Sequence, residues 1–568
     1  MPMRSYEELL QTWCDGLLHW QITGLPDMQS NGAFYCPACK SIHGRCDNAV
    51  FPLLYMFSRS GEEKYRTSAL QLIDWQENLL CDDGAVYNDG NNAWQAITVF
   101  SVSSYLKALT HFGPLLGDTA AVLEQRCRRM CDWLCRSLTT DYLSNINYQA
   151  TNAAAMAAAW KYFGNEAYRA RAAELLAYAL QHFSENKLLY GEGHPHDLLT
   201  AKGCRAIDIG YNAEESLPAL VEAACLLQDE AALQQLTEAL AEQLAFMLPD
   251  GAWDNSFGGR NYKWTYWGSR TTAGCAATYF RMRNRHPAFA AAAAKSVELL
   301  AASTHDGLLY GGPQYRQAGE RPCIHHTFCH AGDLASALLE GLTPEYSAPL
   351  PLAQPQTDLR FYPELATYRL SVGDWIADVT AYDFGQESFA SGRAHATGGA
   401  LSLLYSRQKG PVLVSSVYQY SLTEPLNQQL TLHTARHAPL TPRINLTTDG
   451  RTYSSCLDTT ASLRAECAAG EIIVCADGSL RDIAGRNSGV PYHLDYRFSP
   501  QSVTVTAKIA PSAAGEAAFV LPVVRNTAGL QTPAAVTRRE IFHLIPGFIA
   551  DEYRLDFTDG ALTFTLTL

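Results

Sequence analysis

The chain has 568 residues and a formal net charge of −14 at pH 7. This length exceeds what one hydrophobic core organises, so we expect two or three domains. The acidic balance argues against a nucleic acid as a partner, because contact with phosphate backbones requires a basic face. It is compatible with an anionic sugar, since a local cationic pocket can lie in an acidic surface.

The N-terminal sequence MPMRSYEELLQTW lacks the apolar segment of a signal peptide, and no apolar run reaches transmembrane length. We therefore expect no association with a membrane. Most of the 16 cysteines lie in helical-looking segments, where they are typical of small buried hydrophobic residues. Unbridged cysteines favour a reducing compartment, so the expected location is the cytoplasm. A homo-oligomer remains an open alternative to a monomer.

Apolar residues at positions i, i+3 and i+4, separated by turn signals, predict twelve helices before about residue 345. The predicted ranges are 6–18, 48–58, 62–80, 94–111, 119–137, 151–163, 165–183, 213–227, 229–248, 269–282, 288–303 and 329–341. Short and long connections alternate along this array. Alternate connections of antiparallel helices lie at the same end, so the long loops should gather on one face. Such an array, closed on itself, is an (α/α)6 toroid with a cup at that end.

The composition and the hydrophobic periodicity of the sequence change after the last predicted helix. Leu342–Asp358 is rich in proline and has no helical period, which is typical of a linker. Beyond it, segments of alternating polarity are rich in Val, Thr and Tyr and are separated by Gly, Pro, Asn and Asp. We predict an α+β multidomain protein, with an (α/α)6 toroid at 1–345, a linker at 346–358 and an antiparallel β-sandwich at 359–568.

The fifth long loop, Pro249–Thr271, is the densest candidate site. It carries three tryptophans and three cations, and such rings stack on sugar faces while cations pair with uronate or sulfate groups. The alternative is a buried aromatic plug that closes the helical domain. The candidates from this loop are Asp254 and Tyr262 for catalysis, and Arg260, Lys263, Trp264, Trp267 and Arg270 for binding.

The fourth long loop offers groups for acid–base chemistry: Glu192, His194, Asp208 and Glu214. Asp208 lies between isoleucines, and the loss of solvent expected there would raise its pKa toward use as a general acid. The plainer interpretation of Glu214 is a carboxylate in the first turn of a helix, favoured by the helix dipole.

Polar residues also precede helices in the third and sixth loops. Asn147 and Tyr148 come before an alanine-rich helix, where Asn147 is either an N-cap or a binder of a carboxylate. His325 and His326 precede the last helix and are candidates for substrate binding.

The first long loop carries Cys36, Cys39, His43 and Cys46. A Cys-x-x-Cys pair followed closely by His and Cys is typical of a metal site, and we expect a structural zinc. Reduced, packed cysteines are the alternative. We expect that catalysis requires no cofactor.

A helical toroid followed by a sandwich that starts near SGRAHATGGALSLLYSRQKGPVLVSS resembles the heparinase II/III-like polysaccharide lyases. It also resembles the toroid glycoside hydrolases that remove uronic acids, including a β-glucuronidase family. The local match is R-x-H-x-x-G-G at Arg393–Gly399, which contains His395. The resemblance implies a uronate-containing carbohydrate as substrate. It does not decide between hydrolase and lyase, because one scaffold supports both, and no Asn…His…Tyr set matches the lyases one for one.

Our first hypothesis is a β-glucuronidase-like glycoside hydrolase, in which two carboxylates flank the scissile bond. The expected pairs are Asp208 or Glu192 with Asp254 or Glu214. The abundance of titratable groups on the long loops argues against a third hypothesis, a protein that only binds glycan.

The second hypothesis is a lyase that abstracts the proton α to the uronate carboxylate. Its proton-transfer residue would be Tyr148 or Tyr262. The assisting residues would be one histidine of His194, His326 and His395, together with Asn147 and Arg270.

Overall fold

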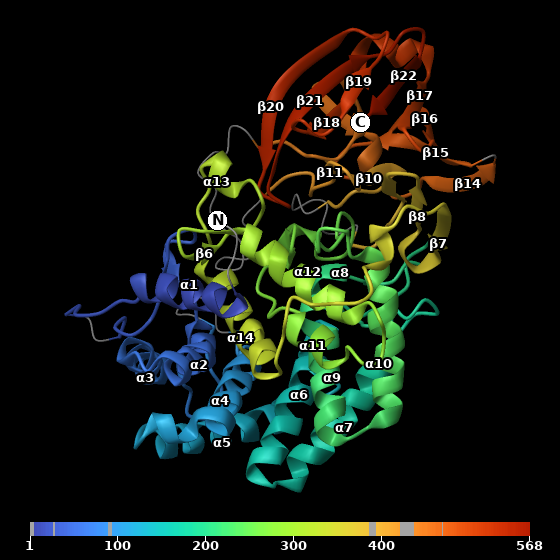
Figure 1. Cartoon of the computed structure of the whole chain (residues 1–568). Helices are drawn as coiled ribbons and strands as arrows, with labels where there is room; N and C mark the ends of the chain where they lie inside the picture. Colours follow the sequence, from blue (N-terminus) through green and yellow to red (C-terminus); the bar gives the residue numbers. More distant parts are fainter. Residues whose placement is uncertain (1–4, 27–28, 89–93, 386–393, 421–436, 469) are drawn as a thin grey trace.

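The structure is a computed structural model of the chain, and it describes residues 5–26, 29–88, 94–385, 394–420, 437–468 and 470–568. Figure 1 shows helices in the N-terminal part and strands in the C-terminal part of these ranges. None of the helices in this part of the chain is long and apolar enough to cross a membrane.

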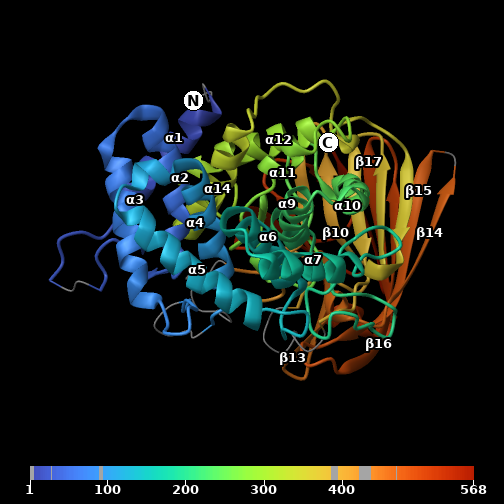
Figure 2. The same ribbon diagram turned by 90° about the horizontal axis from the view of Figure 1, so that it is seen from below.

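Within the described ranges, six helices form an inner ring (Figure 2). They are α2 (Val50–Ser60), α4 (Thr98–Phe112), α6 (Ile146–Phe163), α9 (Leu217–Leu227), α11 (Ala276–Arg281) and α14 (Ile324–Leu339). Each packs against the next, and α14 packs against α2, so the ring closes.

An outer helix packs against each part of this ring. The outer helices are α1 (Tyr6–His19), α3 (Glu63–Gln76), α5 (Thr119–Ser137), α7 (Glu166–Leu180), α10 (Glu230–Gln243) and α12 (Phe289–Ala302). The predicted toroid is therefore confirmed. Among the predicted helices, α6 and α14 start earlier than expected, whereas α4, α9 and α11 start later. A tight hairpin precedes α11.

Local signals in the sequence explain the short connections of the ring. The side chains of Asn165 and Asp229 accept hydrogen bonds from backbone N–H groups at the starts of α7 and α10. Gly61 and Gly164 end α2 and α6 with φ values of 71° and 69°, a conformation that glycine adopts at little cost. The connections from α4 to α5 and from α11 to α12 are also short. The other connections are long, and three contain hairpins: β1 (Tyr35–Cys36) with β2 (Ser41–Ile42), β3 (Trp264–Thr265) with β4 (Gly268–Ser269), and β5 (Thr304–His305) with β6 (Leu308–Leu309).

The C-terminal part, as described, forms two antiparallel sheets. The first has five strands in the order β11-β10-β9-β8-β7, and the second has eleven. The first contains β7 (Asp358–Tyr362), β8 (Thr367–Val372), β9 (Trp375–Thr380), β10 (Ala400–Ser406) and β11 (Gly410–Val414). The second contains β12 (Arg443–Thr448), β13 (Arg451–Ser454), β14 (Ser462–Ala468), β15 (Glu471–Arg481), β16 (Asn487–Phe498), β17 (Ser502–Ile509), β18 (Ala517–Val524), β19 (Gly529–Gln531), β20 (Val536–His543), β21 (Phe548–Asp556) and β22 (Ala561–Thr567).

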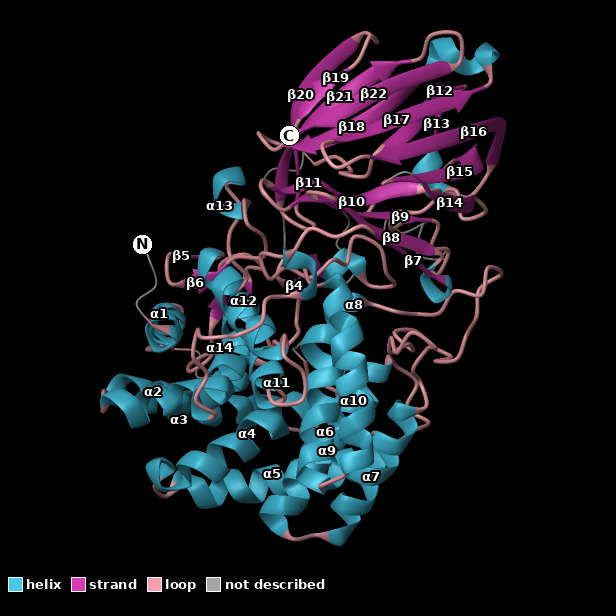
Figure 3. Ribbon diagram, turned by 45° about the vertical axis from the view of Figure 1, so that its right-hand side comes forward, coloured by secondary structure: helices cyan, strands magenta, loops and turns pink. Residues whose placement is uncertain are grey.

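The five-stranded sheet lies between the helices and the larger sheet (Figure 3). Ile376 and Leu403 of this sheet belong to the apolar core of the toroid, whereas Val379 and Leu404 pack with the larger sheet. Side chains alternate between the faces of a strand, so a sheet covered on both faces needs apolar residues at nearly every position. This explains why β9 and β10 are buried throughout.

The sandwich covers the toroid at the end where the long loops gather. The Tyr382 hydroxyl donates to the backbone carbonyl of Arg205 in the fourth loop, at 2.7 Å. Arg369 of β8 pairs with Asp254 of the fifth loop at 2.8 Å. The long loops are therefore enclosed between the ring and the sandwich.

Candidate active site

Side chains from several long loops meet at the mouth of the ring, as the alternation of short and long connections predicted. We call five of them the polar floor: Asn147, Glu192, Glu215, Arg260 and Lys263. Arg260 pairs with Glu192, with 3.1 Å between Nη1 and Oε2, and the Asn147 amide donates to Glu215. All five are buried, so these charges and dipoles act on one another through little solvent.

Asp208 ties the fourth loop to the fifth. Its carboxylate accepts from the backbone N–H of Tyr211 at 3.0 Å, the Asn255 amide at 3.0 Å and the Arg260 N–H at 2.9 Å. It thereby caps the short helix α8 (Ile209–Tyr211). Burial raises the pKa of Asp208, and these hydrogen bonds oppose that rise. The predicted general acid is thus an anchor that orients the backbone carrying Arg260.

A π-helical segment, Asn212–Ser216, joins α8 to α9 and carries two glutamates. Glu214 accepts from the Ser269 N–H at 3.0 Å and the Thr272 hydroxyl at 2.8 Å, so it fastens the fifth loop. Glu215 instead lies beside Asn147, and burial raises its pKa. Such π-helical turns are frequent at functional sites because they displace a side chain from the regular helical path.

Three oxygen atoms of the floor have no hydrogen-bond partner among the described residues. They are Asn147 Oδ1, Glu192 Oε1 and Glu215 Oε2, and all are buried. Burial raises the pKa of Glu192 to about 7, against the opposing effect of Arg260. Buried polar atoms are nearly always paired in native proteins, so three unpaired ones in one place indicate a site for a polar ligand.

Two tyrosines border the floor. The Tyr148 hydroxyl accepts from the Trp94 indole at 2.8 Å, and burial raises its pKa. The Tyr211 hydroxyl lies 3.3 Å from Lys263 Nζ, and the Arg260 guanidinium lies 3.7 Å from the centre of its ring. Tyr211 is not among the residues predicted from the sequence. Its place three residues after Asp208, where a long loop enters a ring helix, was the available signal.

Asn147 and Tyr148 lie in the first turn of α6, because that helix starts at Ile146. The cap position is Asn145, so the N-cap interpretation of Asn147 is wrong. α14 likewise starts earlier than predicted, so His325 and His326 lie in its first turn and not before it. Both histidines are buried, and burial lowers the pKa of each. The His326 ring lies 5.3 Å from that of Trp267, and the His325 ring lies 5.2 Å from that of His43.

The tryptophans of the fifth loop form a buried cluster, which we call the tryptophan cluster: Trp253, Trp264 and Trp267. The Trp264 indole donates to the Trp253 carbonyl at 2.9 Å, and the Trp267 indole donates to the Tyr310 carbonyl at 2.8 Å. The expectation that Trp264 and Trp267 stack on a sugar is therefore wrong. Loop hydrogen bonds and apolar burial hold these rings inward, as the plug alternative predicted.

Other predicted residues lie apart from the floor. Asp254 pairs with Arg369 at the junction with the sandwich. Arg270 donates to the Tyr315 hydroxyl at 2.6 Å. Tyr262 is an exception, because its buried ring lies 6.0 Å from Nζ of the floor residue Lys263. His194 is exposed on the surface.

His395 is also held by the protein, because its ring nitrogens contact the carbonyl oxygens of Ala396 and Phe384 at 3.0 and 2.6 Å. Arg393, the first residue of the R-x-H match, lies outside the described residues.

The predicted metal ligands come together only in part. Cys36, Cys39 and His43 converge with Cys323, which precedes α14. Cys46 is not in this group, because its thiol points to the Phe34 carbonyl at 3.7 Å. We call Cys36, Cys39, His43 and Cys323 the cysteine cluster.

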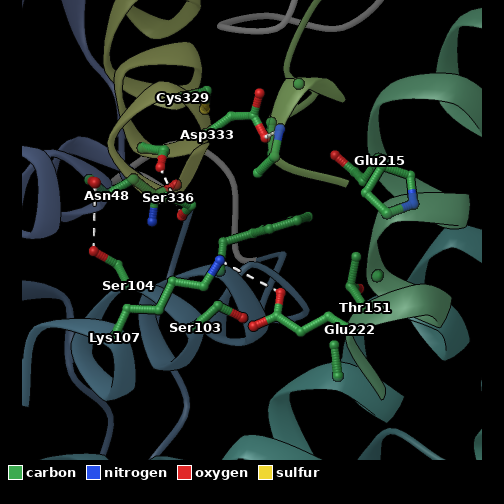
Figure 4. A pocket seen from close by; sticks show the side chains of 18 of the residues that line it. Asn48, Ser103, Ser104, Lys107, Thr151, Glu215, Glu222, Cys329, Asp333 and Ser336 are labelled. Carbon is green, nitrogen blue, oxygen red and sulfur yellow. Dashed lines mark hydrogen bonds and ion pairs between the residues drawn. The ribbon is translucent and has the colours of Figure 1, made fainter. Parts of the chain in front are cut away.

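A cavity of about 140 Å³ follows the axis of the ring (Figure 4). Glu215 of the floor also lines this cavity. Lys107 and Glu222 form an ion pair across the cavity at 3.4 Å. Pockets that enclose a ligand measure about 300–1,000 Å³. The axial cavity is thus smaller than a saccharide site requires. The loop end is the candidate active site because the unpaired oxygens of the floor lie there.

The structure resembles solved toroid-plus-sandwich proteins. A crystal structure of heparinase III superposes with a TM-score of 0.55 and 12% identity, over 99% of this chain and 85% of that one. A second heparinase III gives 0.50 and 12%, over 99% and 83%. At this level of identity the similarity shows the fold alone: a helical toroid followed by a β-sandwich.

The family follows from the sequence comparisons. Residues 10–354 match the ulvan lyase N-terminal domain, and residues 359–542 match the ulvan lyase C-terminal domain. The chain is 36% identical over 529 residues to a broad-specificity ulvan lyase of Formosa agariphila, covering 91% of this chain and 82% of that protein. The chain belongs to the ulvan lyase family.

Membership of this family corrects our first hypothesis, a glycoside hydrolase, because the matched domains and the homologous protein are those of a lyase. The structure supplies a physical reason. Asp208 and Asp254, which we expected to flank a scissile bond, are engaged in anchoring the fourth loop and the domain junction. The lyase alternative was the better one.

Proposed function

We propose that this protein cleaves a uronate-containing polysaccharide of the ulvan type by β-elimination. The observation that carries the proposal is the polar floor, where two cations and an amide lie beside two phenols. A homologous ulvan lyase supports the choice of substrate class.

In the elimination, a base takes the proton from the carbon next to the uronate carboxylate. The electron pair forms a carbon–carbon double bond as the bond from the β carbon to the glycosidic oxygen breaks. That oxygen leaves with the departing sugar and gains a proton. Negative charge develops on the uronate carboxylate before the bond breaks, and fixed cations and dipoles lower this barrier. We assign this task to Asn147, Arg260 and Lys263.

The two tyrosines divide the proton transfers between them. Lys263 and Arg260 beside Tyr211 stabilise negative charge on its oxygen, which suits the base. Tyr148 accepts from Trp94, and burial raises its pKa, so it keeps a proton to donate to the leaving oxygen. Environments that differ between two titratable groups are a common basis for separate acid and base roles.

The test is to incubate the full chain with ulvan and follow the ultraviolet absorbance of an unsaturated uronate. Mass spectra of the products should show oligosaccharides lighter by one water than hydrolysis would give. p-Nitrophenyl β-glucuronide is the parallel substrate for the hydrolase reaction. Saturated products without an ultraviolet signal would contradict elimination, and no cleavage of any uronate polysaccharide would remove the proposal.

A further inference from the structure

The cysteine cluster has the geometry of a metal site. Cys323 Sγ lies 3.7 Å from Cys36 Sγ, 3.6 Å from Cys39 Sγ and 3.6 Å from His43 Nε2. The four ligand atoms all lie within 4.8 Å of one another. The cluster brings together residues that are up to 287 positions apart in the chain.

The three separations from Cys323 match the edges of a tetrahedral zinc site. With Zn–S near 2.3 Å and Zn–N near 2.0 Å, the edges of the tetrahedron measure about 3.5–3.8 Å. A disulfide would bring two sulfurs to about 2.05 Å, so the sulfurs of the cluster are not bridged. We propose that the cysteine cluster binds one zinc ion.

The local backbone prepares two of the ligands. The hairpin of β1 and β2 pairs Cys36 with Ser41, and the Lys40 N–H donates to the Cys36 carbonyl at 2.9 Å. Lys40 has a φ of 54°, which tightens the turn between the strands. The Cys39 N–H donates to Cys36 Sγ at 3.3 Å, a contact that stabilises a thiolate and orients it.

The site is structural, because all four tetrahedral positions are taken by protein. Cys36, His43 and Cys323 are buried, which leaves no open position for a substrate. The zinc would fasten the first long loop to the start of α14. His43 contacts the His325 ring at 5.2 Å, and Arg45 donates to the Thr271 carbonyl at 2.8 Å, so the fastened loop contacts both α14 and the fifth loop.

The first experiment measures metal in the full-length chain, purified under reducing conditions without chelators. We expect about one zinc per chain. After exchange, cobalt(II) should give the visible bands of tetrahedral cobalt and a thiolate charge-transfer band. Less than a tenth of an equivalent of zinc, together with no cobalt bands after reduction and incubation with the metal, would overturn the proposal.

The second experiment compares two cysteine variants. Cys323→Ser should lower the zinc content at least tenfold, whereas Cys46→Ser, the matched control, should keep it. A chelator should lower the Tm of the wild type and of Cys46→Ser. The opposite pattern, with loss of zinc in Cys46→Ser alone, would overturn the assignment of Cys323. If Cys323→Ser does not fold, the cobalt spectrum of the wild type decides. Neither readout depends on enzyme activity, so the outcome is separate from that of the proposed function.

Discussion

The tryptophan cluster and the polar floor lie at the same end of the toroid, and the fifth loop contributes to both. In the cluster, large apolar rings are enclosed, and Trp264 and Trp267 each donate to a backbone carbonyl. In the floor, buried oxygen atoms of Asn147, Glu192 and Glu215 lack partners among the described residues. Residues that attract attention in a sequence can serve stability alone, whereas three unpaired amide and carboxylate oxygens gathered in one place point to a ligand.

The largest loss of activity should come from removing the hydroxyl of either tyrosine beside the floor. Tyr148→Phe and Tyr211→Phe should each lower kcat on ulvan by about 10²–10⁴-fold, the usual contribution of a proton-transfer group. Tyr142→Phe is the matched control. Its ring lies 6.2 Å from that of Tyr148, but it has no role in the proposed proton transfers. The ultraviolet assay measures the rates. A loss of less than about tenfold in either variant would remove that tyrosine from the proposed mechanism.

Substitution in the tryptophan cluster should lower the free energy of unfolding and leave the reaction rate per folded molecule unchanged. Trp264→Ala should cost about 3–5 kcal/mol of unfolding free energy, as removal of a fully buried ring does. Trp160→Ala should cost less, because that side chain is only half-buried. Denaturant unfolding measures both. If Trp264→Ala kept its stability but lost its rate per folded molecule, the division between the two regions would be wrong.

Glu192 should make the stability of the floor depend on pH. Burial raises its pKa from 4.5 to about 7, so between these values the native state holds a proton that the unfolded chain has lost. Its contribution is therefore present below pH 4.5 and is lost as pH rises through 7. Relative to Glu192→Gln, the wild type should lose on the order of 2 kcal/mol between pH 5 and pH 8, at about 1.36 kcal/mol per pKa unit. Urea unfolding of both proteins at the two pH values tests this, and a difference independent of pH would contradict it.

The smallest effect on activity should come from Asp254, which sequence reasoning placed in the catalytic set. Its pairing with Arg369 predicts that Asp254→Asn lowers stability but keeps kcat within about tenfold and leaves the pH–rate profile unchanged. Activity measured across pH under conditions where the variant is folded provides the test. A much larger loss, or a shifted profile, would return Asp254 to the chemistry.

Periodicity and connector length in the sequence were sufficient to predict the ring, the sandwich and the meeting of the long loops. These signals are local, since apolar spacing within a helix and glycine or asparagine at its ends act over a few residues. Asn147, Arg260 and Lys263 were also among the candidates, because cations and amides in long loops suit a charged sugar.

Only the tertiary structure decided which of the candidates are anchors. The roles of Asp254, Trp267 and Cys323 depend on partners in other loops or in the sandwich, at separations of 115, 43 and 287 positions. No local pattern encodes such contacts, because they arise from how the loops pack between the ring and the five-stranded sheet. Packing determined which candidates became anchors, and the candidate site is where the unpaired oxygens of Asn147, Glu192 and Glu215 come together.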